Sequence, residues 1–222
     1  MVEATAKFIK ARMKDWKESN LNMMKEAIFT FQTLVAHCER IPKRAVAVYT
    51  PFLCEKIGDI KMMGPIKELL TDLGQFVSAK YISIQVVKKG LATKAPNNIK
   101  ESANFLAALI DEYGAGKVAV KECIDFAVFC ANHANKNVRD ASMTLFATVY
   151  KHLGEAVRTF LTDIKSSTMA LIDAEFEKVT PLKKGEFKSE REAKGDLADE
   201  PEVNVDAAAS LDAALPREDI TK

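Results

Sequence analysis

Hydrophobic residues recur in this chain at spacings of three and four positions rather than at every second position. The spacing is clearest in three stretches, at residues 44–57 (RAVAVYTPFLCEKI), 79–92 (AKYISIQVVKKGLA) and 117–133 (KVAVKECIDFAVFCANH). Such spacing is typical of helices that bury one face. The pattern therefore predicts helices over these three stretches.

A second set of helices follows from an internal repeat. Four segments align without gaps at a period of 39 residues: 19–31, 58–70, 97–109 and 136–148. Their first shared column is a short polar residue: Asn20, Asp59, Asn98 and Asn137. The next column is aliphatic: Leu21, Ile60, Ile99 and Val138. The third is usually basic: Asn22, Lys61, Lys100 and Arg139.

Asn and Asp side chains can cap the exposed N–H groups of a helix start, so each segment is expected to open a helix at the first column. Two helices every 39 residues are typical of HEAT repeats, whereas ankyrin and tetratricopeptide periods are shorter. The runs VAVY and ISIQVV would suit strands in isolation, but the repeat overrides that local signal. The sequence predicts an all-α HEAT-repeat solenoid.

Glycines mark where the repeats are expected to close. Gly74, Gly114 and Gly154 each follow a helical stretch, and a helix C-terminus favours a residue that tolerates left-handed backbone geometry. A fifth, incomplete unit follows at residues 155–180, with a helix expected within IKSSTMALIDAEFEKV.

The composition changes after Pro181. Residues 1–180 carry 25 Lys+Arg and 20 Asp+Glu, whereas residues 181–222 carry 7 and 11 and contain a single aromatic residue, Phe187. We therefore expect residues 1–180 to form the repeat domain. Residues 181–222 are predicted to be a flexible acidic linker that leads towards a following domain.

Composition excludes several classes of protein. A chain of 222 residues with 48% hydrophobic residues can bury a core without disulfides or a structural metal. Its four cysteines include no CxxC pair, which argues against a disulfide framework and favours a reducing cytosol. The N-terminus lacks the apolar region of a secretory signal, and no run of 18 apolar residues predicts a membrane span.

Catalytic and cofactor motifs are absent from the sequence. None of the three histidines lies in a nucleophile or metalloprotease motif, and there is no glycine-rich phosphate loop. Cys123, Cys130 and His133 share one helix face and could hold a metal, but a closed zinc site needs four ligands and buried core positions explain the cysteines better. We therefore predict no enzyme and no cofactor.

Two interpretations stay open for Trp16. It precedes the first repeated segment, where an exposed indole would suit an interaction hot spot. Alternatively, its ring covers the open end of the array. The methionine pairs Met23/Met24 and Met62/Met63, one period apart, favour packing between repeats.

The loop columns are the candidate binding site. Because a solenoid repeats its geometry, Lys61, Lys100 and Arg139 are expected to form a basic ridge along one edge. Solubility alone could explain such charges. However, cations near a helix N-terminus oppose the helix dipole, so their recurrence favours a negatively charged partner.

Several strings in the chain resemble the TOG domains of the microtubule polymerase family that includes mini spindles and its vertebrate homologue. They cover most of residues 14–180: KDWKESN, CEKIGDIK, KAPNNIKESANFLAALIDEYG, NKNVRDASMTLFATVYKHLG and ALIDAEFEKV. The likeness is greatest to the third domain of a multi-TOG chain, and LPREDITK at the C-terminus resembles the entry to a following TOG domain. No full repeat precedes residue 14, so the chain is expected to lack a complete first repeat.

The resemblance implies a paddle-like domain whose intra-repeat loops contact αβ-tubulin or the microtubule lattice, beside adjacent TOG domains of the same chain. The contacts carried over by motif are Ser19, Asn20, Asp59, Lys61, Pro96, Asn97, Asn98, Lys100, Asn135, Lys136, Asn137 and Arg139. Trp16 matches a tryptophan that leads the second repeat and does not inherit a contact role.

The implied function is a non-enzymatic module that promotes microtubule growth and spindle organisation. Its expected location is the cytoplasm and cytoskeleton, at microtubules, centrosome or spindle pole, or kinetochore. Neither nucleic acid nor membrane is an expected partner. A HEAT scaffold for another spindle-pole or kinetochore protein is the alternative.

Overall fold

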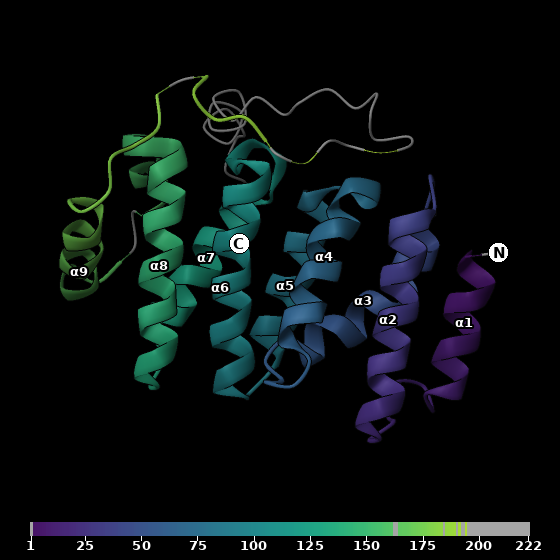
Figure 1. Cartoon of the computed structure of the whole chain (residues 1–222). Helices are drawn as coiled ribbons and strands as arrows, with labels where there is room; N and C mark the ends of the chain where they lie inside the picture. The colour runs from purple at the N-terminus through teal and green to yellow at the C-terminus, as the bar shows by residue number, and fades with distance from the viewer. Residues whose placement is uncertain (1, 162–163, 184, 190, 192–193, 195–222) are drawn as a thin grey trace, which may run out of the picture.

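A computed structural model describes residues 2–161, 164–183, 185–189, 191 and 194 (Figure 1). Its described residues form helices and turns without a strand. The α-helices are α1 (Val2–Arg12), α2 (Leu21–His37), α3 (Lys43–Lys56), α4 (Met63–Val77), α5 (Ala79–Ala92), α6 (Pro96–Tyr113), α7 (Val120–Ala131), α8 (Lys136–Leu153) and α9 (Ser166–Phe176). Two 3-10 helices, η1 (Ala115–Lys117) and η2 (Gly154–Phe160), join them. The all-α prediction is confirmed.

The helices stack as antiparallel hairpins in two layers. Helices α1, α3, α5 and α7 pack in sequence to form one layer, while α2 with α4 and α6 with α8 form the other, and α9 packs on α8. One continuous apolar core runs between the layers, and its largest fully buried rings belong to Tyr49, Phe31, Phe52, Phe105, Phe126 and Phe146. Each repeat therefore buries its hydrophobic face against its neighbours, as in a solenoid.

The strand-like runs are helical, and the repeat explains why. VAVY lies within α3 and ISIQVV within α5, each on a helix whose inner face is buried between neighbouring repeats. Burial of this apolar face stabilises each helix by more free energy than the weak helix propensity of Val and Ile costs.

Helix starts differ in detail from the predicted column. Asn20 caps α2, because its side chain accepts hydrogen bonds from the N–H groups of Asn22 and Met23. Asp59 instead closes a turn ahead of α4. Asn98 and Asn137 lie within the first turn of α6 and α8, so the predicted caps at these two positions are wrong. Helix α6 starts earlier because a proline, fixed in helical φ, opens it, and Asn135 caps α8.

The predicted repeat ends are right at two of three glycines. Gly114 and Gly154 follow α6 and α8 with φ of 84° and 58°. Gly74 instead lies inside α4. A glycine is needed there because the ring of Tyr113 packs so closely that a Cβ would stand 2.8 Å from its hydroxyl oxygen. Helix α4 continues to Val77, and Ser78 takes the left-handed position with φ of 77°.

Trp16 is partly buried and packs against the core, which decides between its two interpretations. Its ring stacks on Phe52 with centroids 4.7 Å apart and meets Phe31 edge-on at 6.3 Å. The indole N–H donates to the carbonyl of Val48 at 3.0 Å. The ring therefore covers the core between α2 and α3, and it is not an exposed hot spot.

The chain after α9 runs back over the ends of the helices. Leu182 bonds to the C-terminal turn of α8 through its backbone N–H, and Arg191 pairs with carboxylates of α4 and α6. The division into a domain at 1–180 and a flexible linker at 181–222 stays a prediction, although the described residues Leu182 and Arg191 contact the repeats. Residues 195–222 lie outside the described residues.

Candidate functional site

Four short loops that join the two helices of each hairpin lie along one long edge of the molecule, at the bottom of Figure 1. We name them loop 1 (residues 13–20), loop 2 (57–62), loop 3 (93–95) and loop 4 (132–135). The loop edge consists of these loops together with the first five residues of the helix that follows each. Helix N-termini open directly after every loop. The predicted site residues therefore gather on one edge, as the repeat predicts.

Loop 1 is held from inside by Glu18. Its carboxylate is 7% exposed and accepts from the N–H groups of Ser19 and Asn20 at 2.8 Å each, with Lys14 at 3.1 Å. The hydrogen bond from Asn20 is the main cause that lowers the pKa of Glu18. Lys14, Asp15 and Trp16 all have positive φ, so the loop is a tight left-handed turn. Ser19 is left exposed beside it.

Asparagines at the start of α6, directly after loop 3, join loop 3 to loop 2 and the end of α3. Asn98 donates to the carbonyl of Glu55 at 2.7 Å and accepts from the N–H of Gly58 at 3.0 Å. Asn97 donates to the carbonyl of Gly58. A Cβ on Gly58 would stand 2.1 Å from the Asn98 side-chain oxygen. The second and third repeats therefore share one rigid connection at the loop edge.

Loop 4 is braced by the residue that the repeat places in the basic column. The guanidinium of Arg139 donates to the carbonyls of His133 at 2.9 Å and Ala134 at 2.7 Å. Asn135 accepts from the N–H of Asn137 at 2.9 Å as the α8 cap. Lys136 and Asn137 stay exposed ahead of this frame.

The predicted basic ridge has unequal members. Lys61 is exposed, whereas Arg139 is engaged with loop 4 and Lys100 pairs with Glu101 at 2.7 Å. Glu101 also pairs with Lys67 of α4 at 2.5 Å. Burial alone would raise the pKa of Glu101, but hydrogen bonds from Lys100 and Lys67 outweigh it and lower the pKa. Lys61 is thus the most available cation of the three.

Ile60 is an exposed apolar residue that the sequence did not single out. It is 81% exposed, although Ile99 and Val138 in the same column are 1% and 0% exposed. The difference arises because α4 begins only at Met63, so Ile60 stands in the loop rather than on the helix. The glycine and the Gly-Pro pair that flank it in GDIKMMGP were the signal that this helix starts late.

The cysteine and histidine cluster offers no site. Cys123 and Cys130 are completely buried in the apolar core, and burial raises the pKa of both thiols, that of Cys130 to about 12. Among the described residues, no three His, Cys, Asp or Glu side chains gather as metal ligands. Within the same residues, no helix is long and apolar enough to cross a membrane.

Several solved structures share this architecture. Drosophila melanogaster Mini spindles TOG3 superposes with a TM-score of 0.73 at 20% identity, over 82% of this chain and 81% of that one. A structure described as "Structural Basis of Tubulin Recruitment and Assembly by Microtubule Polymerases with Tumor Overexpressed Gene (TOG) Domain Arrays" matches with a TM-score of 0.67 at 20% identity. That match covers 86% of this chain and 41% of the other. At these identities the likeness establishes the HEAT-repeat fold.

Comparison of sequences extends the likeness to a family. Protein MOR1 of Oryza sativa subsp. japonica is 24% identical over 207 residues, which cover 93% of this chain and 10% of that protein. The chain therefore spans about a tenth of this relative's length. A family model described as "XMAP215/Dis1/CLASP, TOG domain" matches residues 16–176, which include all four loops from Trp16 onwards. The chain belongs to the XMAP215/Dis1/CLASP TOG domain family.

Proposed function

We propose that the loop edge binds αβ-tubulin, and that the chain is a non-enzymatic tubulin-binding module of a microtubule polymerase. The observation that carries the proposal is the loop edge itself, a row of rigid loops that presents a free lysine and a free isoleucine side by side in loop 2. A relative of the same fold is described in terms of tubulin recruitment and assembly. The module would accordingly work in the cytoskeleton.

Rigidity is what makes this edge suited to a folded partner. The hydrogen bonds of Glu18, Asn98 and Arg139 fix the backbone of the loops before any partner arrives. Binding then costs little loop ordering, which otherwise subtracts from affinity. A fixed row of loops also matches a fixed surface better than a flexible one.

Residues of the loop edge divide into two roles under this proposal. Those whose side chains are exposed would contact the partner: Ser19, Ile60, Lys61, Pro96, Lys136 and Asn137. Those whose side chains hold the loops would position them: Asn20, Asp59, Asn97, Asn98, Asn135 and Arg139. Lys100 would do both, because its ion pair with Glu101 leaves it 31% exposed.

Charge and apolar surface supply different parts of binding. Lys61 and Lys136 would steer the edge towards an acidic tubulin surface, and this attraction weakens as salt rises. Ile60 would supply the desolvated contact that slows dissociation. Adjacent TOG domains in the same chain would add avidity, because linkage raises the effective concentration of each module.

Soluble tubulin is the reagent that tests the proposal. The variant Ile60→Asp with Lys61→Glu removes both exposed groups of loop 2, and we expect at least a tenfold loss of affinity for tubulin in chromatography or sedimentation. Because both side chains are exposed, the melting temperature should stay within about 2 °C, as surface substitutions usually change stability by less than ~0.5 kcal/mol.

A matched control places the same charge change elsewhere. Leu171→Asp on α9 with Lys80→Glu at the start of α5 replaces an exposed apolar residue and an exposed lysine away from the loop edge. This variant should bind tubulin as the native chain does. Equal loss in both variants would mean that net charge alone matters. Unchanged binding of the loop 2 variant would reject the assigned site and favour a scaffold role for this domain.

A further inference from the structure

The described residues between Leu182 and Lys194, which we call the strap, cross the edge opposite the loop edge. Figure 1 shows this segment leaving α9 and running over the upper ends of α8 and α6 towards α4. Its two ends are pinned by backbone hydrogen bonds. The N–H of Leu182 donates to the carbonyl of Lys151 at 2.8 Å, and the N–H of Lys194 donates to the carbonyl of Gln75 at 2.8 Å.

The first side-chain anchor of the strap is Phe187. Its ring lies over Gly114, where a Cβ would stand 2.6 Å from the ring, and meets the His152 ring edge-on at 4.8 Å. His152 is 3% exposed on its side chain and contacts Asp111 at 3.0 Å. Gly114 thus does more than end α6, since its missing side chain makes the seat for this ring.

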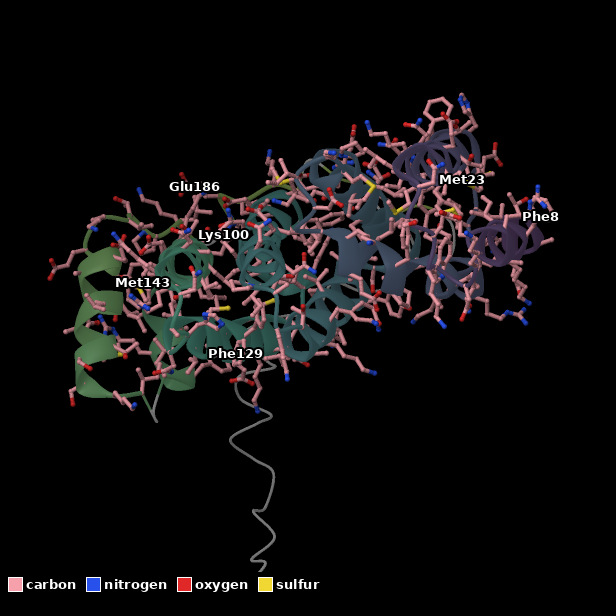
Figure 2. All side chains as sticks on the ribbon, turned by 90° about the horizontal axis from the view of Figure 1, so that it is seen from below. Phe8, Met23, Lys100, Phe129, Met143 and Glu186 are labelled. Carbon is pink, nitrogen blue, oxygen red and sulfur yellow. The ribbon has the colours of Figure 1, made fainter. Side chains whose placement is uncertain are left out.

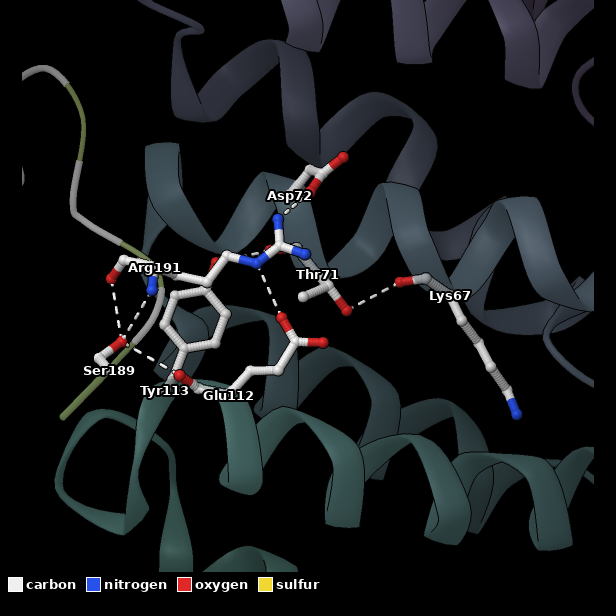
Figure 3. A network of polar contacts seen from close by, with 7 residues as sticks. All are labelled: Lys67, Thr71, Asp72, Glu112, Tyr113, Ser189 and Arg191. Atoms are coloured by element: carbon white, nitrogen blue, oxygen red, sulfur yellow. Dashed lines mark hydrogen bonds and ion pairs between the residues drawn. The ribbon is translucent and has the colours of Figure 1, made fainter. Parts of the chain in front are cut away.

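The second anchor is Arg191, which bridges two helices (Figure 3). Its Nε donates to the carboxylate of Glu112 on α6 at 2.7 Å, and a terminal nitrogen donates to Asp72 on α4. Ser189 supports it, because the serine hydroxyl accepts from the Arg191 N–H at 3.2 Å and contacts the Glu112 carbonyl at 3.1 Å. One guanidinium therefore attracts two carboxylates from different helices and holds them on either side of its positive charge.

This bridge stands where two neighbouring helices of one layer, α4 and α6, have little direct contact. Helix α6 packs closely along α8, whereas α4 packs on α5, α2 and α3. The Tyr113 ring of α6 packs against Gly74 of α4, and polar contacts also join the two helices. Lys67 pairs with Glu101 near the loop edge, and the Tyr113 hydroxyl donates to the Thr71 carbonyl at 2.6 Å near the strap. These contacts fix the angle between α4 and α6 only if the two helices are held together both at the loop edge and at the strap.

We propose that the strap is a conformational clamp that fixes the angle between the second and third repeats and so sets the spacing of loops 2 and 3. Phe187 seats the strap on α6, and Arg191 then closes α4 onto α6. The asparagine connection between loops 2 and 3 holds the same junction from the other edge. The effect of the clamp on a partner rests on the proposed function, whereas its effect on the junction does not.

Hydrogen exchange of the full chain tests the clamp without any partner. In Phe187→Ala with Arg191→Ala, amides in the last turns of α4 and α6 should exchange at least about tenfold faster, because local opening of the junction costs less. Amides in the first turns of α2, which lie at the loop edge and away from the strap, should be unchanged. Lys188→Ala, an exposed strap residue, is the control and should alter neither set.

A mutant cycle separates the loss of the Arg191 ion pairs from the loss of other strap contacts. In the background Asp72→Asn with Glu112→Gln, Arg191→Ala should accelerate exchange by at most about threefold, since the carboxylates that Arg191 pairs with are gone. Unchanged exchange in the Phe187→Ala, Arg191→Ala variant would overturn the clamp.

Tubulin binding of that same variant tests the last step. We expect a loss of at least threefold in affinity when loops 2 and 3 are no longer held at a fixed spacing. Faster exchange with native affinity would overturn the link to the loop edge. If the native chain binds no tubulin, the proposed function fails, while the exchange result still decides the clamp.

Discussion

Replacing Gly58 by alanine probes the connection between loops 2 and 3 with a single methyl group. The added Cβ would lie 2.1 Å from the Asn98 side-chain oxygen and 2.7 Å from both its Cα and its backbone nitrogen. Rotation of the Asn98 side chain relieves the first contact but not the other two. The backbone at the start of α6, directly after loop 3, must therefore move away from loop 2.

The energetic consequence follows from the contacts that this movement breaks. Asn98 makes one hydrogen bond to Gly58 of loop 2 and one to Glu55 at the end of α3, and Asn97 makes one to Gly58. At about 1 kcal/mol for each bond, with additional cost for polar groups left without partners, the loss is roughly 2–4 kcal/mol. For a domain of this size, that corresponds to a fall in melting temperature of roughly 5–15 °C.

The assay is thermal or denaturant unfolding of Gly58→Ala beside Gly64→Ala. Gly64 lies in the first turn of α4 with nothing within 4 Å of an added Cβ. Its replacement should be neutral or stabilise by up to about 1 kcal/mol, since alanine favours the helix. If Gly58→Ala were as stable as Gly64→Ala, loops 2 and 3 would not be joined as described, and the rigid loop edge would be refuted.

Two further substitutions test other parts of the structure. Trp16→Ala should destabilise the chain by about 3–5 kcal/mol, because the ring stacks on Phe52 and covers the core. Unchanged unfolding together with lost partner binding would mean that the ring is an exposed contact residue. Glu101→Gln should cost about 1–2 kcal/mol at pH 7 by leaving Lys67 and Lys100 without their carboxylate. The lowered pKa of Glu101 contributes stability above its ordinary pKa of 4.5 that is lost as the pH falls through the folded value, so unfolding of Glu101→Gln should depend less on pH between about 5 and 3; a parallel curve would contradict the ion pairs.

The sequence predicted the architecture because periodicity reports burial directly. The 39-residue register placed all four loops on one edge, and α5 has the predicted bounds of residues 79–92. Helix starts were less predictable. Asn98 occupies the cap column but forms hydrogen bonds to the neighbouring repeat, and no local pattern distinguishes those two uses of an asparagine.

Contacts between distant segments account for the rest. Gly74 looked like a helix end, yet it is needed where Tyr113 of the next repeat packs. The strap was expected to be a linker because acidic composition with few aromatics is typical of disorder. Phe187 and Arg191 stand alone among polar residues, so no local pattern marks them. They hold the strap only through contacts with Gly114, Glu112 and Asp72, which lie far away in the sequence.

The central claim is that one edge of this TOG domain meets tubulin. Hydrogen exchange of the full chain with and without soluble αβ-tubulin maps that contact directly. Exposed apolar side chains also lie elsewhere on the surface, at Phe8 and Phe129 (Figure 2). We predict that tubulin slows exchange in loops 1 to 4, most strongly around Ile60 and Lys61. Protection confined to the strap or to the outer faces of α3, α5 and α7, or no protection at saturating tubulin, would contradict the claim.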